Sequence, residues 1–210
     1  MTAKADLSAL NLARIDFGTP LPAKVSTETL DLLLNRRSAP APTLGLPAPS
    51  EDEIEVLIKV GFRVPDHGKI GPWRIVRFTP ESKAALVGKL RALAEARGDK
   101  AQAGALLKLS TPPEALLVIY SPVQPHKIPL WEQIGSAMAV CQNLLIAAGA
   151  MGYGTNWITD WYSYDAAAKA ILGLKDGEEV AGFIFLGTPT EAPLERDRPD
   201  FAERVSFWEG

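Results

Sequence analysis

Apolar residues recur along this chain in two patterns that alternate from one segment to the next. Some segments place them three to four residues apart, as in helices that bury one face, and others hold short apolar runs typical of buried strands. This alternation predicts an α/β or α+β domain. The expected helices lie at residues 27–35, 101–109, 131–151 and 164–172, with two more that open at 50–53 and 79–81, and the expected strands lie at 73–78, 114–120, 153–159 and 180–186.

Residues that cap helices mark several of these boundaries. Ser26 precedes the first helix as a plausible N-cap, and Ser50 with Glu53 three positions later forms a capping box. Pro80 stands at the first position of the next helix, where proline is favoured. Residues 39–49 contain four prolines and are predicted to form a loop.

The segment 131–151 predicts a long helix that is apolar on several sides. Such a helix lies either at the centre of a core or in a subunit interface. Its longest apolar stretch, 137–151, is interrupted by Gln142 and Asn143, and we expect it to be too short and too polar to cross a bilayer. The single cysteine, Cys141, falls inside this pattern and is predicted to be a buried, inert thiol.

The length and the net charge of the chain limit the kinds of protein that it can be. The chain has 210 residues, which suits one domain at 26–210 preceded by an extension at 1–25 with weak periodicity. The net charge is −3 with no concentration of basic residues, so nucleic acid is an unsuitable partner. The N-terminal region has no continuous apolar segment, and we therefore expect a cytoplasmic protein with no membrane partner.

Motifs for several common chemistries are absent from the sequence. It contains no G-x-S-x-G, H-E-x-x-H or G-K-[ST] pattern, and only His67 and His126 are available to a hydrolytic triad. His126 lies in a loop predicted to face solvent. The segment 152–157 carries two glycines but follows a helix and lacks the third glycine, so it does not match a dinucleotide fingerprint. A hydrolase without a cofactor is therefore a poor candidate, and we expect no metal site.

Arginines near predicted turns are the remaining candidates for chemistry. Arg36, Arg37 and Ser38 follow a helix, where the arginines can cap the helix end or clamp a phosphate, and the pattern alone favours capping. Arg63 and His67 lie in a loop between a helix and a strand, where either can contact a ligand or simply face solvent. Two more arginines stand in a charged C-terminal tail and can equally be surface charges; they are Arg196 and Arg198.

Several segments together resemble the nitroreductase family over about residues 27–207. The segments that carry the resemblance are 32–38, 61–67, 71–73, 126–129 with 131–133, and 180–189. Each is weak alone, but their order and spacing match the family. The resemblance implies an α+β fold, a three-layer sandwich with a mainly antiparallel central sheet flanked by helices. It also implies an intertwined homodimer with FMN at the subunit interface and the 131–151 helix in that interface.

The resemblance also implies roles for individual residues. Arg36, Arg37 and Ser38 would bind the ribityl phosphate and nearby flavin atoms, and either Arg198 alone or Arg198 together with Arg196 would also lie at the phosphate. Arg63 and His67 would reach the flavin of the partner subunit. The residues implied to line the isoalloxazine ring are Trp157, Ile158 and Thr159. Gly71 and Ile158 depart from the residues common in relatives, so the substrate preference can differ.

The implied activity is hydride transfer from NADH or NADPH through flavin N5 to an electron-poor acceptor, such as a nitroaromatic or a quinone, in a ping-pong scheme. The flavin carries this chemistry, so no dedicated catalytic side chain is expected. Two alternatives stay open. One is a flavin-binding sensor or reservoir without turnover, and the other is an FMN enzyme that catalyses a different reaction, such as desaturation or dehalogenation.

Overall fold

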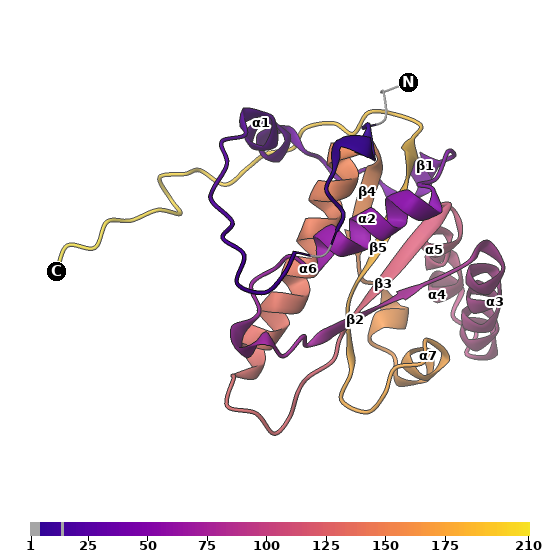
Figure 1. The fold of residues 1–210 in the computed structure, drawn as a ribbon. Helices are drawn as coiled ribbons and strands as arrows, with labels where there is room; N and C mark the ends of the chain where they lie inside the picture. The colour runs from indigo at the N-terminus through magenta and orange to yellow at the C-terminus, as the bar shows by residue number, and fades with distance from the viewer. Residues whose placement is uncertain (1–4, 14) are drawn as a thin grey trace.

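An antiparallel sheet forms the centre of the computed structural model, which describes residues 5–13 and 15–210 (Figure 1). β5 pairs with β1, β3 and β4, and β3 also pairs with β2, every pair being antiparallel. This confirms the mainly antiparallel sheet that the family resemblance implied. The strands are β1 (Leu44–Gly45), β2 (Trp73–Arg77), β3 (Glu114–Tyr120), β4 (Gly154–Ile158) and β5 (Glu179–Pro189).

The central strand β3 shows why helices must cover both faces of the sheet. All its residues are buried, and successive side chains point to opposite faces. Leu116 and Val118 belong to the hydrophobic cluster on one face, whereas Leu117 and Ile119 belong to the cluster on the other. A continuous apolar run therefore requires two helical layers, which confirms the three-layer arrangement.

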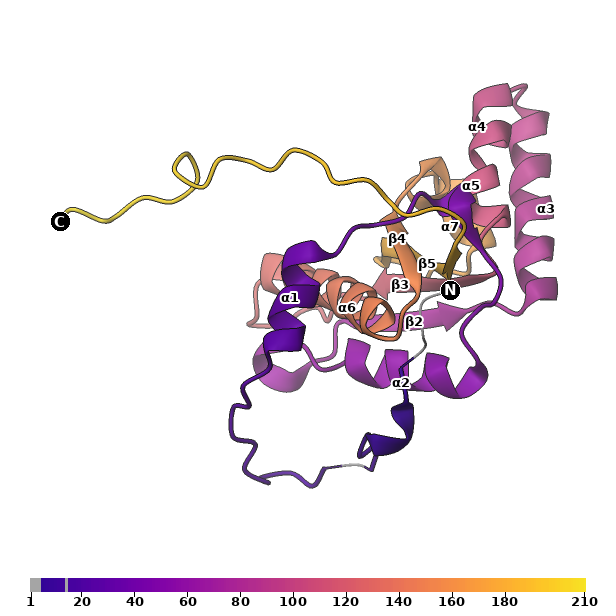
Figure 2. The same ribbon diagram turned by 90° about the horizontal axis from the view of Figure 1, so that it is seen from above.

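One helical layer contains α2 and α6, which pack on the sheet and on each other, with α1 lying against α6 (Figure 2). The other contains α3, α5 and α7, with α4 packed on α3. The helices are α1 (Thr27–Asn35), α2 (Glu51–Gly61), α3 (Pro80–Ala96), α4 (Lys100–Ala105), α5 (Leu107–Ser110), α6 (Leu130–Ala150) and α7 (Ala166–Ile171), with short 3₁₀ turns η1 (Leu7–Ala9), η2 (Ala41–Thr43), η3 (His67–Lys69) and η4 (Trp161–Ser163).

Most predicted boundaries agree with the structure, and the differences have local causes. The Ser50–Glu53 capping box is present, and Ser26 caps α1. The predicted loop 39–49 also contains η2 and β1, because Leu44 and Gly45 pair with the end of β5. The predicted helix 101–109 is divided at Leu106 into α4 and α5. The predicted helix 164–172 begins at 166, after its N-cap Asp165.

The long helix α6 is a core helix that also meets the simple criteria for crossing a membrane. It has 21 residues and a window of mean hydropathy 1.2, and it extends beyond the shorter apolar stretch 137–151 that the sequence analysis considered. Half of that window is buried inside the structure. Its buried Gln133 bonds to the backbone of the 123–128 loop, and Ser136 bonds to Pro65. Burial and polar contacts of this kind are typical of a helix inside a globular core.

The two ends of the chain lie over or beyond this body. In the N-terminal segment, Leu7 packs against the cluster formed with α2 and α6. After β5, the chain runs past α1 and then extends away from the body (Figures 1 and 2). Phe201, Phe207 and Trp208 in this tail are exposed. The division into an extension at 1–25 and a domain at 26–210 stays a prediction.

Candidate functional site

The segment Arg36–Ser38 is held beside the edge strand β4. Helix α1 ends because Arg36 adopts an extended conformation while its backbone N–H still donates to Leu32. The chain is then fixed to β4 by two bonds, from the Ala39 N–H to the Thr155 carbonyl at 2.9 Å and from the Asn156 side-chain amide to the Ala39 carbonyl at 2.6 Å. The two arginines and the serine therefore project next to this edge.

Three arginines gather here, and two of them pair with a single carboxylate. Glu195 Oε1 lies 3.5 Å from Arg37 Nη1 and accepts a hydrogen bond from Arg198 Nη2 at 3.0 Å. Arg36 Nη2 donates to Ser38 Oγ at 2.9 Å. Burial, followed by the charges of Arg198 and Arg37, lowers the pKa of the Arg36 guanidinium. The cluster thus brings together Arg36, Arg37, Ser38 and Arg198, and it carries a surplus of positive charge.

This surplus fits an anionic ligand in two respects. Three guanidinium groups against one carboxylate leave two positive charges without a partner among these residues, and a phosphate monoester carries about −1.5 to −2 at neutral pH. In addition, Arg37 Nε is buried without a hydrogen-bond partner among the residues that the structure describes. A buried donor of this kind costs about 1–3 kcal/mol if it stays unsatisfied. An oxygen-rich anion would supply the missing acceptors.

At the end of α1, the backbone and the side chain of Arg36 make separate contacts. The N–H of Arg36 completes the last turn of α1, but the contacts of its guanidinium are with Ser38 and the neighbouring charges. The helix end would therefore survive the loss of this side chain.

Residues 157–159 of the β4 edge point their side chains in different directions. The Trp157 indole lies on β5, where its Nε1 donates to the Ala181 carbonyl at 3.1 Å, and a Cβ added at Gly182 would lie 2.0 Å from that nitrogen. Ile158 packs into the cluster on the opposite face, and Thr159 Oγ1 bonds to the Tyr164 hydroxyl. A planar ligand can therefore meet all three residues only along the backbone edge of β4.

Arg63 and His67 lie in the 62–72 loop, which polar side chains of α6 fix in place. His67 Nδ1 is 2.6 Å from Glu132 Oε2, Ser136 Oγ donates to the Pro65 carbonyl at 2.5 Å, and Asn143 Nδ2 donates to the Arg63 carbonyl at 3.0 Å. The sequence reasoning did not assign a role to Glu132, although it belongs to the 131–133 segment of the family resemblance. A carboxylate on one ring nitrogen of histidine sets which nitrogen faces outward.

His67 is remote from the arginine cluster within one chain. Leu32 of α1 lies against Gly149, near the end of α6, whereas His67 contacts Glu132 in its first turn (Figure 1). These two positions of α6 are 17 residues apart, or about 26 Å along a helix that rises roughly 1.5 Å per residue. The structure therefore does not bring His67 together with Arg36 in the same chain.

The other residues discussed in the sequence analysis are Arg196, His126 and Cys141. Arg196 is exposed and donates its backbone N–H to Glu195. His126 is exposed, as predicted. Cys141 is buried, and burial raises the pKa of its thiol to about 12, which confirms an inert cysteine.

Sequence comparisons identify relatives along most of the chain. A sequence profile described as "Nitroreductase family" matches residues 44–188. "Putative NAD(P)H nitroreductase YdjA" of Escherichia coli strain K12 is 30% identical over 184 residues, which cover 86% of this chain and 100% of that protein. A "Putative NAD(P)H nitroreductase" of Haemophilus influenzae is 28% identical over 78% of this chain and 90% of its own length.

Solved structures share the fold. A nitroreductase-like family protein from Bacillus cereus superposes with a TM-score of 0.75 at 21% identity, covering 90% of this chain and 100% of its own. The NADPH:FMN oxidoreductase from Vibrio harveyi, complexed with NAD⁺, gives 0.68 at 20% identity, covering 85% and 76%. A nitroreductase with bound FMN from Bacteroides fragilis gives 0.67 at 18% identity, covering 88% and 100%. These likenesses confirm the predicted fold.

Proposed function

This chain belongs to the nitroreductase family, a family of oxidoreductases, and we propose that it is an FMN-dependent NAD(P)H oxidoreductase. The observation that carries the proposal is the clustering of Arg36, Arg37 and Arg198, of which only Arg37 and Arg198 pair with a carboxylate, that of Glu195. Relatives named as NAD(P)H nitroreductases and a neighbour of the same fold with bound FMN support it.

The residues beside β4 would hold the cofactor at its phosphate end. Arg36, Arg37 and Arg198 would bind the ribityl phosphate, with Ser38 Oγ as a further polar contact. Residues 157–159, at the end of β4, would meet the ring system, and Gly182 leaves room for the Trp157 indole against β5. When bound, FMN would supply hydride transfer from NADH or NADPH to an electron-poor acceptor such as a nitroaromatic or a quinone in a ping-pong scheme.

A second copy of the chain would complete the site. Since His67 and the arginine cluster lie at different ends of α6, a single flavin can meet both only if His67 comes from the partner subunit. The resemblance implies that Arg63, in the same loop, would reach the flavin from that subunit too. The surface around α1 and α6 carries apolar side chains suited to association, among them Leu34 at 80% and Trp131 at 71% exposure. The proposal is therefore a homodimer with FMN between subunits. We expect it to be cytoplasmic.

The test of activity is anaerobic reduction of the FMN-loaded protein. Addition of NADH or NADPH is expected to bleach the visible flavin absorbance within seconds, and a nitroaromatic or a quinone should then restore it. Flavin that binds tightly but stays oxidised would instead indicate a sensor or reservoir. Bleaching without turnover of either acceptor would point to a different reaction, such as desaturation or dehalogenation.

The shared site makes a separate prediction about assembly. Dilution of the protein until the dimer dissociates should release FMN, because each flavin would lose the contacts of the partner subunit. Gel filtration with absorbance detection measures both events at once. A monomer that elutes with stoichiometric FMN would contradict the shared site.

A further inference from the structure

A pocket lies away from the arginine cluster, at the start of α2 and the end of β2, where α3 passes over the 110–114 loop. Its volume is about 850 Å³, within the size range of small-molecule sites. Apolar residues form much of its wall; they include Leu46, Phe78, Val87 and Pro113. The residues proposed above to bind flavin do not line it.

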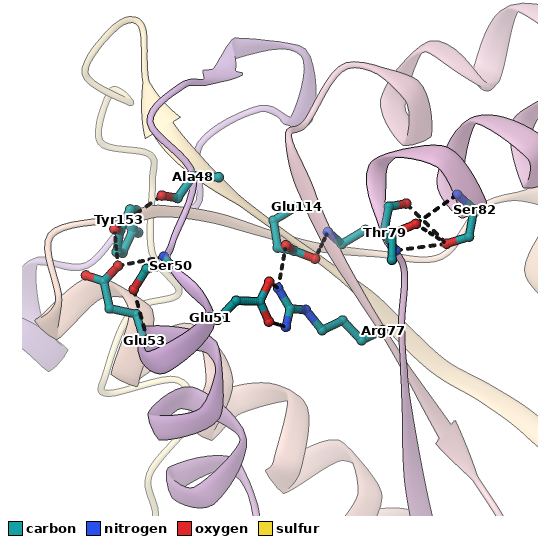
Figure 3. A network of polar contacts seen from close by, with 10 residues as sticks. Ala48, Ser50, Glu51, Glu53, Arg77, Thr79, Ser82, Glu114 and Tyr153 are labelled. Atoms are coloured by element: carbon teal, nitrogen blue, oxygen red, sulfur yellow. Dashed lines mark hydrogen bonds and ion pairs between the residues drawn. The ribbon is translucent and has the colours of Figure 1, made fainter.

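Charged side chains from four elements meet in this pocket, and Figure 3 shows three of them, Glu51, Arg77 and Glu114. The Arg77 guanidinium bonds to both carboxylate oxygens of Glu51, with Nη2 and Oε1 2.8 Å apart, and its Nη2 lies 3.4 Å from Glu114 Oε2. Lys83 Nζ donates to the Pro112 carbonyl. The pocket therefore holds two cations and two carboxylates.

The two carboxylates differ in how firmly they are held. The side chain of Glu114 is 10% exposed and lies under Arg77, whereas that of Glu51 is 82% exposed at the start of α2. An exposed ion pair contributes only about 0–1 kcal/mol, so Glu51 can leave Arg77 at little cost. Once Glu51 has moved into solvent, Arg77 and Lys83 face Glu114 alone and the pocket gains one net positive charge.

We propose that this pocket binds a small organic monocarboxylate with an apolar body, whose carboxylate replaces that of Glu51 on Arg77. The planar guanidinium fork already pairs with a carboxylate in two-point geometry, so a ligand carboxylate can reproduce the same contacts. The apolar wall accommodates the rest of the molecule. This site is independent of the flavin proposal, since it uses different residues.

The proposal is tested by calorimetric titration of the full-length, FMN-saturated protein with benzoate. Saturable binding is expected, and neutral benzamide should neither bind nor compete. Glu51→Gln should tighten benzoate about two- to fivefold, because the competing carboxylate is gone. Arg77→Lys should weaken it about tenfold or more, since the two-point contact is lost.

A matched control is Arg97→Lys. Arg97 pairs in the same two-point manner with Asp165 but does not line the pocket, so this variant should bind benzoate as the unaltered protein does. Because Glu51 is exposed, its variant is expected to fold normally and still reports if Arg77→Lys is unstable. Absence of saturable binding to the unaltered protein and to Glu51→Gln would overturn the proposal. Binding that is insensitive to both Glu51→Gln and Arg77→Lys would overturn it as well, by placing benzoate elsewhere.

Discussion

Replacing Arg36 with methionine separates a phosphate-binding role from a role in capping α1. Methionine keeps much of the aliphatic side chain and removes the guanidinium. The backbone N–H of residue 36 still completes the last helical turn through Leu32, so α1 should end as before. The change therefore acts mainly on the positive charge beside Arg37 and Arg198.

The expected loss follows from the contacts that this side chain can make. A hydrogen bond to a charged group contributes about 1.5–3 kcal/mol, which corresponds to about 10- to 150-fold weaker binding of FMN. Removing one of the three arginines also halves the cluster's surplus of two positive charges. Riboflavin, which has no phosphate, should bind the variant and the unaltered protein equally well.

Titrations that follow flavin fluorescence measure both affinities, and thermal unfolding without flavin measures the stability of the variant. The prediction is a large change for FMN, none for riboflavin, and little change in the unfolding temperature. If Arg36→Met binds FMN normally but unfolds more easily, the arginine stabilises the helix end and the phosphate assignment is wrong.

Three further predictions concern the scaffold. The buried carboxylate of Glu178 bonds to Arg74, which lowers the pKa of Glu178 to about 2. The ionised carboxylate should therefore stabilise the fold by about 3 kcal/mol above pH 4.5, and this contribution should disappear as the pH falls toward 2. The acid-unfolding curve of Glu178→Gln should be flatter over that range. Gly182→Ala should displace the Trp157 indole, giving a shift in tryptophan fluorescence and weaker FMN binding; an unchanged spectrum would contradict the close packing. Gly71 has a φ of 56°, so Gly71→Ala should lower the free energy of unfolding by about 1 kcal/mol in denaturant titrations, and equal stability would show that the turn relaxes.

The sequence predicts the fold well because its local signals and its core pattern agree. The apolar run at 114–120 coincides with β3, and the Ser50–Glu53 capping box opens α2. β1 could not be predicted, because Leu44 and Gly45 are extended only through pairing with the distant end of β5. The polar positions of α6 also depend on tertiary structure, since Ser136 bonds to a loop that is 71 residues away.

For the candidate site too, some features can be predicted from the sequence and others arise only from the fold. The adjacent residues Arg36, Arg37 and Ser38 are visible in the sequence, but their convergence with Arg198 depends on the path of the chain after β5. Glu195 and Glu132 were not assigned as site residues, although Glu132 lies in a segment of the family resemblance, because each gains its role only through a long-range contact. The charge surplus and the buried Nε of Arg37 likewise appear only in three dimensions.

The central claim is that basic residues from distant parts of the chain form one binding site for the phosphate of FMN. Its most direct test is a pair of equilibrium titrations of the unaltered protein, one with FMN and one with riboflavin, each at low and high salt. We predict one FMN bound per chain, riboflavin binding weaker by at least about 100-fold, and a preference for FMN that decreases with salt. Equal affinity for the two flavins at both salt concentrations would contradict the account.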